Sequence, residues 1–388
     1  MAFRGILRVL MASALVGGLS ASAAEPGELP RTMAWTAYNL GTTGYNQSVG
    51  IGQMLRQRYN VTLRVIPGNN DISRLIPLRR GMAQFSASGV ASYFAQEGVF
   101  QFAHPDWGPL PLRLLASSNG DSNQALAVAA DTGISEFSEL RGKRIPWVRG
   151  APALNVSTEA FLACGGLGWN DVQRVEFPGY SAMWNGIQNN QIDAAFATTV
   201  SGPTRQLEAS PRGISWPTVA HDDEACWARL TRIAPYFTPH VATRGAGISD
   251  EAPHEGATYP YPLLITLADQ HAGVVRALVA AIDTHFEDFR HADPGAVGWA
   301  RDRQQFDWVV PYHAGAIAHW RSVGAWTAAH DTHNDALIRR QEVLAEAWAA
   351  VTERGIRNAD AFRDAWLELR AERLEAAGFD PVWHRPID

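Results

Sequence analysis

The chain contains 388 residues, 46% of them hydrophobic and 19% charged, a composition that is typical of globular proteins and excludes extensive disorder. Its length suffices for two domains. The formal net charge of −6 and the single lysine, Lys143, argue against a nucleic-acid partner, because phosphate binding needs clustered positive charge.

The first 24 residues are typical of a secretory signal peptide. Arg4 and Arg8 give a positive start, residues 6–19 are mostly apolar, and residues 21–23 read Ala-Ser-Ala, a small-residue cleavage site. The alternative is a membrane anchor, which needs about 20 apolar residues in a row, and this stretch is shorter. We therefore predict a signal peptide over residues 1–24 and an exported, periplasmic protein.

The two cysteines, Cys164 and Cys226, lie far apart in the sequence. They cannot form a four-thiolate metal site or a Cys-x-x-Cys redox centre. In an oxidising compartment they can pair in a disulfide. The alternative is two separate buried thiols, and the sequence leaves both outcomes open because it does not show their distance.

The first half of the mature chain alternates short apolar segments with amphipathic ones. Strands are predicted over residues 33–40, 61–66, 82–86, 112–116 and 125–129, and helices over residues 45–59 and 72–80. Polar turns follow the first three strands, and the turn at residues 67–71 is a candidate helix N-cap.

The second half repeats this plan. Strands are predicted over residues 144–148, 172–177 and 192–197, and helices over residues 155–164 and 181–188. Residues 78–85 and 188–196 each combine a helix end, a polar turn and a short apolar strand, so the same βαβ unit occurs once in each half. Alternating strands and helices predict an α/β fold of two lobes with parallel sheets and a ligand cleft between them.

Helical patterns dominate the rest of the chain. A further strand is predicted over residues 259–267 and a long helix over 268–289, and residues 337–372 form two helices with a break at 355–358. The predicted domains are lobe one, lobe two and a C-terminal helical extension. They cover residues 31–120 plus 262–330, residues 121–261, and residues 331–388.

Six segments, spread in order over residues 31–327, carry a family resemblance. They are Gly41-Thr42-Thr43-Gly44-Tyr45, Pro67-Gly68-Asn69-Asn70-Asp71-Ile72, residues 81–93, Leu140-Arg141-Gly142-Lys143-Arg144-Ile145, Asn190-Gln191-Ile192-Asp193-Ala194, and Val310-Pro311-Tyr312-His313-Ala314-Gly315-Ala316-Ile317. As an ordered set they resemble the TAXI family, the solute receptors of tripartite ATP-independent periplasmic (TRAP) transporters. The resemblance implies a type II periplasmic-binding-protein fold, in which two lobes joined by crossing strands close on an organic anion.

Polar residues at predicted helix starts and strand ends are the candidate ligand-binding residues. They are Thr42, Thr43, Tyr45, Asn69, Asn70, Ser88, Ser117, Arg149, Asn155, Tyr180, Thr198 and Thr199. A carboxylate ligand needs N–H donors, hydroxyls and preferably an arginine, and backbone amides at a helix start supply the first of these. For the turn at residues 41–45, and for Asn69 and Asn70, the alternative is helix capping alone.

One loop departs from the family pattern. The family usually has the motif PPGSGT after the first strand of lobe two, whereas this chain has Arg149-Gly150-Ala151-Pro152-Ala153-Leu154 there. The hydroxyl donors are lost and Pro152 has no amide hydrogen, which puts family ligands such as glutamate in question. The guanidinium of Arg149 can replace the lost donors by binding a carboxylate in a bidentate manner. The alternative is a solvated loop arginine.

No motif indicates catalysis or a metal. The Gly-x-Ser-x-Gly elbow is absent from the sequence, and the charges of His221-Asp222-Asp223 suit a helix start. The histidines near the end of lobe one, His313, His319, His330 and His333, match no metal-binding spacing. We therefore expect no enzyme activity, no cofactor and no metal.

These observations together predict an extracytoplasmic solute-binding receptor of a TRAP-type transporter. It would capture a small organic anion, a carboxylate or an amino acid, and deliver it to the TRAP membrane subunits. One alternative is a receptor of the same fold that serves an ABC transporter or a membrane sensor. A weaker alternative is an enzyme on a bilobal fold.

Overall fold

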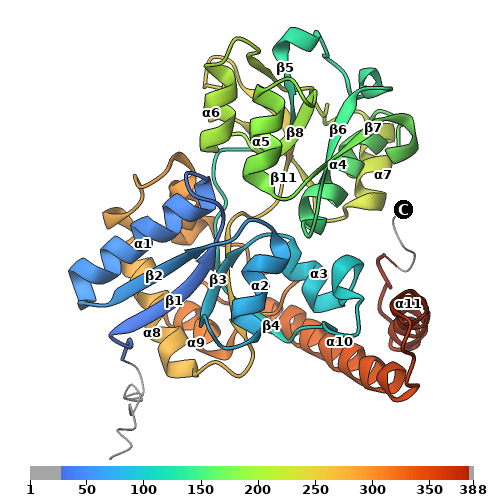
Figure 1. Cartoon of the computed structure of the whole chain (residues 1–388). Helices are drawn as coiled ribbons and strands as arrows, with labels where there is room; N and C mark the ends of the chain where they lie inside the picture. Colours follow the sequence, from blue (N-terminus) through green and yellow to red (C-terminus); the bar gives the residue numbers. More distant parts are fainter. Residues whose placement is uncertain (1–27, 384–388) are drawn as a thin grey trace, which may run out of the picture.

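The computed structural model describes residues 28–383, and the expected signal peptide, residues 1–24, lies outside this range. The strands form two lobes, one above the other in Figure 1, and two long helices follow at the C-terminal end. This is the mixed α/β, type II periplasmic-binding-protein-like fold expected from the sequence. Among the described residues, no helix is long and apolar enough to cross a membrane.

Lobe one is built on a five-stranded sheet with the order β2-β1-β3-β12-β4. Its strands are β1 (Thr32–Ala37), β2 (Thr62–Pro67), β3 (Phe85–Ser88), β4 (Leu112–Ser117) and β12 (Leu263–Leu267). Strand β1 is parallel to β2 and β3, whereas β12 is antiparallel to β3 and β4. The expected parallel pairing is therefore confirmed for β1, β2 and β3 but is wrong for β12, because β12 belongs to the returning chain and enters this sheet from the opposite end.

Five α-helices pack around this sheet (Figure 1). They are α1 (Thr43–Tyr59), α2 (Asp71–Arg79), α3 (Ala91–Glu97), α8 (Ala272–Thr284) and α9 (Ala314–Ser322). Helix α1 buries Ile51 and Leu55 against a core that includes Trp35 and Phe85 of the sheet. The predicted N-cap is confirmed, since the Asn70 side chain accepts a hydrogen bond from the Ser73 amide at 2.8 Å.

Lobe two contains three small sheets with the orders β8-β5-β9, β6-β7 and β10-β11. The strands are β5 (Gln124–Ala129), β6 (Arg144–Val148), β7 (Gln173–Phe177), β8 (Ala194–Thr198), β9 (Ile214–Ser215), β10 (Thr238–Ala242) and β11 (His254–Thr258). The helices are α4 (Pro152–Cys164), α5 (Tyr180–Gln188), α6 (Gly202–Glu208) and α7 (Glu224–Ile233). Here too the sheets are mixed, because β6 and β7 are parallel but β5 and β8 are antiparallel.

The two cysteines form a disulfide. Cys164 at the end of α4 is bonded to Cys226 in α7, and their Cα atoms are 4.2 Å apart. Of the two outcomes left open by the sequence, pairing is the one the structure contains. The bond ties together two helices of lobe two that are distant in sequence.

Two crossovers connect the lobes. The chain passes from β4 to β5 and returns from β11 to β12. Of the strand predicted over residues 259–267, residues 263–267 form β12, whereas residues 259–262 form the returning crossover. The crossovers are hydrogen-bonded to each other, from the Ser118 amide to the Pro262 carbonyl at 2.9 Å and from the Tyr261 amide to the Ser118 carbonyl at 2.8 Å. We propose the lobe limits given above, because both crossovers lie at these limits.

The C-terminal extension consists of α10 (Ala328–Glu353) and α11 (Ala359–Ala376). The predicted break is confirmed, and Gly355 adopts a φ of +65° there. Trp383, beyond α11, contacts both lobes: its ring lies 4.9 Å from that of Phe94 in lobe one, and its indole N–H donates to the Ile233 carbonyl of lobe two at 2.8 Å. The extension therefore joins the flanks of the two lobes.

Candidate ligand-binding site

A small cavity lies between the lobes beside the crossovers, and we call it the closed cavity because contacts between the lobes narrow it. Its polar walls come from lobe one (Tyr38, Asn39, Thr42, Asn69, Asn70, Asp71 and Arg74) and from lobe two (Gln124, Tyr180, Thr198, Ser201, Tyr259 and Tyr261). Its volume is about 60 Å³, which is room for about two water molecules. Ligand pockets usually measure about 300–1,000 Å³, so the lobes are closed tightly on each other.

Five of the twelve candidate residues line this cavity, namely Thr42, Asn69, Asn70, Tyr180 and Thr198. Thr42 and Thr198 are buried, and Thr42 donates its hydroxyl hydrogen to the Asn39 carbonyl at 2.7 Å. Each of the five lies at a helix start or a strand end, which is the feature that marked it in the sequence.

The other seven candidates do not line the cavity. Three of them bond within their own lobe: Ser117 accepts from the Gln305 amide, Thr199 donates to the Arg244 carbonyl, and Asn155 bonds both backbone groups of Val148. The remaining four are Thr43 and Ser88, which are buried in lobe one, Tyr45, which lines a groove on its outer side, and Arg149, which is exposed.

A buried ion pair is the central feature of the cavity wall that the sequence analysis missed. Asp71 and Arg74, one helical turn apart at the start of α2, are only 2% and 4% exposed. An Arg74 Nη2 hydrogen is donated to Asp71 Oδ1, and the guanidinium lies 4.0 Å from the centre of the Tyr38 ring. Arg74 Nε is buried and has no hydrogen-bond partner among the described residues.

The second oxygen of the same carboxylate reaches into lobe two. Asp71 Oδ2 accepts a hydrogen bond from the Ala153 amide, at 2.9 Å, in the first turn of α4. Pro152 begins this helix and has no N–H, so Ala153 carries its first available amide hydrogen. Asp71 thus connects an arginine of one lobe to a helix N-terminus of the other.

Burial dominates the electrostatics of this cavity. It raises the pKa of Asp71 above the ordinary value, because Arg74 and the Ala153 amide offset the loss of hydration only in part. Burial also raises the pKa of Tyr180 to about 12 and the pKa values of Tyr259 and Tyr261 well above their ordinary range. The phenols are therefore uncharged at neutral pH, and the cavity contains one ion pair with no net charge.

Further hydrogen bonds cross the rim of the cavity. Asn39 Nδ2 donates to Ser181 Oγ at 3.0 Å, and Asn70 Nδ2 donates to the Arg149 carbonyl at 3.1 Å. The close approach also requires a glycine, since a Cβ at Gly202 would lie 2.5 Å from the Gly41 carbonyl oxygen. These contacts join lobe one to lobe two.

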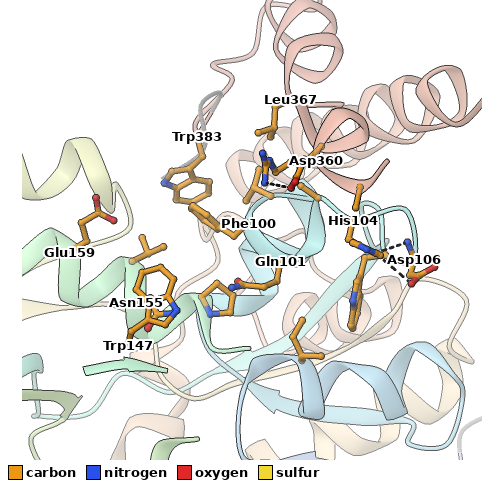
Figure 2. A pocket seen from close by; sticks show the side chains of 18 residues that line it. Phe100, Gln101, His104, Asp106, Trp147, Asn155, Glu159, Asp360, Leu367 and Trp383 are labelled. Atoms are coloured by element: carbon orange, nitrogen blue, oxygen red, sulfur yellow. Dashed lines mark hydrogen bonds and ion pairs between the residues drawn. The ribbon is translucent and has the colours of Figure 1, made fainter. Parts of the chain in front are cut away.

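A larger, open cavity lies beside the closed one, and Figure 2 shows its walls. It measures about 590 Å³ and is lined by all three parts of the chain, including Phe100 of lobe one, Trp147 of lobe two and Trp383. Ile72 and Pro152 line it, while their neighbours Asp71 and Ala153 line the closed cavity. The Asp71–Ala153 contact therefore separates the two spaces.

A closed cavity walled by two α/β lobes, with paired crossovers at its side, defines the class of bilobal binding-protein folds. A family model described as "NMT1/THI5 like" matches residues 84–226, less than half of the chain. A search of curated proteins gives no match. Among the described residues, no group of histidine, cysteine or acidic side chains is arranged to hold a metal ion.

Solved structures match this chain at low sequence identity. The alkanesulfonate-binding protein SsuA from Xanthomonas axonopodis pv. citri is 16% identical, with a TM-score of 0.44, covering 83% of this chain and 93% of that one. PhnD1 from Prochlorococcus marinus, in complex with methylphosphonate, is 10% identical, with a TM-score of 0.44, covering 76% and 100%. The substrate-binding protein of an amino acid ABC transporter is 12% identical, with a TM-score of 0.40, covering 67% and 96%.

Proposed function

We propose that this protein is an extracytoplasmic solute-binding receptor that encloses a small molecule between its lobes. The observation that carries this proposal is the closed cavity, which is walled from both lobes and sealed by hydrogen bonds between them. The signal-peptide pattern in residues 1–24 supports export, and the matched NMT1/THI5-like segment supports the assignment.

The proposed ligand is a small organic acid or amino acid with a single acceptor group. Arg74 Nε is a buried donor without a partner, and it is suited to such a group. The cavity has no net charge, so its chemistry favours a solute with at most one negative charge. Thr42, Asn69, Asn70, Tyr180 and Thr198 would contribute further polar contacts, and the tyrosine rings would contribute stacking surface.

Ligand capture would proceed by lobe closure. A solute that contacts both lobes stabilises the closed state over the open one by the difference in its contacts. Membrane subunits would then recognise the closed form. The proposed transporter is of the ABC type or the TRAP type. Uptake by the receptor and its membrane subunits in vesicles separates these two, since only the ABC type requires ATP.

A thermal-shift titration of the mature protein tests the receptor function. The probes are organic acids, amino acids and their amides, and binding to the folded state raises the midpoint as the probe concentration rises. We expect a saturable rise with at least one probe and an unaltered probe at the end of the experiment. If no probe gives a saturable rise, or if the bound probe is turned over, the receptor proposal is wrong.

A pair of glycine variants tests the closure mechanism. Gly202→Ala places a methyl group against the Gly41 backbone and should weaken binding of the probe at least tenfold. Gly168→Ala is the matched control, because a Cβ at this lobe-two position meets nothing within 4 Å. Equal affinity of the two variants would contradict capture by closure.

A further inference from the structure

The Asp71 carboxylate occupies a position with the features of a ligand subsite. It lies between the two lobes and bonds a guanidinium of lobe one and a helix-terminal amide of lobe two. An arginine and a helix N-terminus are the two groups that most often hold carboxylates in proteins, because both present N–H donors in a positive field. Here both donors are satisfied by a side chain of the protein itself.

The helix is long enough for its N-terminus to carry this field. Helix α4 has 13 residues, and its first turn contains no acidic residue. The amides of Leu154 and Asn155 bond the Ala151 carbonyl at 3.1 and 3.2 Å, so the Ala153 amide is the donor that remains for an anion. The carboxylate that accepts from it comes from the opposite lobe.

Arg74 provides a second and independent indication of a ligand. It is 4% exposed, lines the cavity, and keeps one buried N–H, that of Nε, without a partner. A buried donor without an acceptor is unfavourable, because it has lost its hydration and gained no partner. An arginine that served only to neutralise Asp71 would have no need for a spare buried donor.

We propose that Arg74 and the N-terminus of α4 form a carboxylate-binding subsite across the cleft, and that this chain fills the subsite with its own Asp71. The side chain then acts as a built-in ligand group that holds the closed form together when no solute is present. This deepens the proposed function, on which the consequence for selectivity rests. The solute places one acceptor on Arg74 Nε, and a second carboxylate is excluded because Asp71 already occupies its position.

Chemical rescue tests the subsite without any knowledge of the solute. Asp71→Ala removes the carboxylate and leaves a space of the size of formate. We expect sodium formate at neutral pH to raise the unfolding midpoint of this variant saturably, by at least about 2 °C, relative to sodium chloride at equal ionic strength. The wild-type protein, whose subsite is filled, should show no saturable rise.

Two variants serve as controls. Asp360→Ala removes an exposed carboxylate that also neighbours an arginine, Arg363, and should show no formate response. Asp71→Asn keeps an acceptor for the Ala153 amide and fills the space, so it should fold and should also show none. If the Asp71→Ala chain is unfolded, refolding yield replaces the midpoint, and we expect recovery with formate but not with chloride.

The outcomes separate this proposal from the receptor function. An equal response of Asp71→Ala to formate and chloride, or an equal formate response of Asp360→Ala, would overturn the subsite. Neither result bears on solute binding by the wild-type protein, which the thermal-shift screen measures separately. Conversely, formate rescue would establish the subsite even if every solute probe failed.

Discussion

Two of the buried carboxylates that pair with arginines in the described residues, Glu97 and Asp71, are bound very differently. Glu97, at the end of α3, accepts from Arg340 through both oxygens, at 2.7 and 2.8 Å, and from Arg370 as well. Asp71 has one arginine and one backbone amide, and its arginine keeps an unused donor. The first cluster joins lobe one to the C-terminal extension, and the second joins lobe one to lobe two.

The two pKa values shift in opposite directions. Burial alone would raise the pKa of Glu97, but the charges and hydrogen bonds of its two arginines together lower it below the ordinary value. Burial raises the pKa of Asp71, and its single arginine does not reverse this. The comparison indicates that the Glu97 cluster is a structural link between lobe one and the extension. The Asp71 pair, by contrast, is incompletely satisfied at the place where the proposed mechanism separates the lobes.

The largest loss of stability is expected when the Glu97 cluster is disrupted. Glu97→Gln leaves Arg340 and Arg370 buried beside a neutral amide, and we expect a loss of about 3–5 kcal/mol in the free energy of unfolding. Urea denaturation measures it. Asp360→Asn, which removes the charge of an exposed pair, is the control and should leave the midpoint unchanged. A loss below about 1 kcal/mol for Glu97→Gln would contradict a stabilising link between lobe one and the extension at this cluster.

The second-largest loss of stability is expected when the contact between the extension and lobe two is removed. Trp383→Ala deletes a ring that packs against Tyr93 and Phe94 and a hydrogen bond to Ile233, and should cost about 3 kcal/mol. Trp383→Phe keeps a ring in place and should lose only about 1 kcal/mol, the value of the hydrogen bond. Urea midpoints rank the two variants, and equal losses would contradict a packing role for the ring.

The pH dependence of stability should separate the two carboxylates by sign. Glu97 has a lowered pKa when folded, so its contribution is present above its ordinary pKa of 4.5 and is lost as the pH falls through the folded value. Asp71 has a raised pKa when folded, so stability is lost as the pH rises from its ordinary value of 3.8 through the folded value.

Urea midpoints of the wild type, Glu97→Gln and Asp71→Asn between pH 3 and 7 measure these slopes. The wild-type advantage over Glu97→Gln should shrink on acidification, by on the order of 1 kcal/mol for each unit of pKa shift. Relative to wild type, Asp71→Asn should instead gain as the pH rises. If the stability differences of both variants from wild type changed with pH in the same direction, the proposed difference between Glu97 and Asp71 would be wrong.

The smallest effect is expected at Arg149, the arginine that the sequence placed in the site. Its side chain is exposed, and its carbonyl alone contacts lobe one, by accepting from Asn70. Arg149→Ala should therefore change the free energy of unfolding by less than about 0.5 kcal/mol and leave probe affinity within twofold. A large loss of affinity, measured by the same thermal-shift titration, would return the anion site to this loop.

Local patterns in the sequence predicted the fold well. The alternation of strands and helices, the N-cap at Asn70 and the two C-terminal helices depend on neighbouring residues, and all are present. The direction of β12 was missed because it depends on where the chain re-enters lobe one, which no local pattern records.

The site was predicted only in part, for a related reason. Asn69, Asn70 and Tyr180 lie at turns or helix starts that a sequence pattern marks, whereas Tyr259 and Tyr261 reach the cavity through the returning crossover. Asp71 and Arg74 resemble an ordinary charged pair at a helix start, and only burial by the opposite lobe gives them another role. A signal was nevertheless present, since Asp71 belongs to one of the six segments that carried the family resemblance.

The side chain of Trp383 also constrains how the molecule can move. It attaches one flank of lobe two to lobe one and the extension. The hydrogen-bonded crossovers at Ser118 and Pro262 attach lobe two to lobe one at a second place. Two fixed places define a line, so the proposed opening of the cleft would be reduced to a rotation about that line, a single degree of freedom. Helix α6 lies on the opposite side of the molecule from α11 (Figure 1), so the Gly41–Gly202 end of the cleft would travel the farthest.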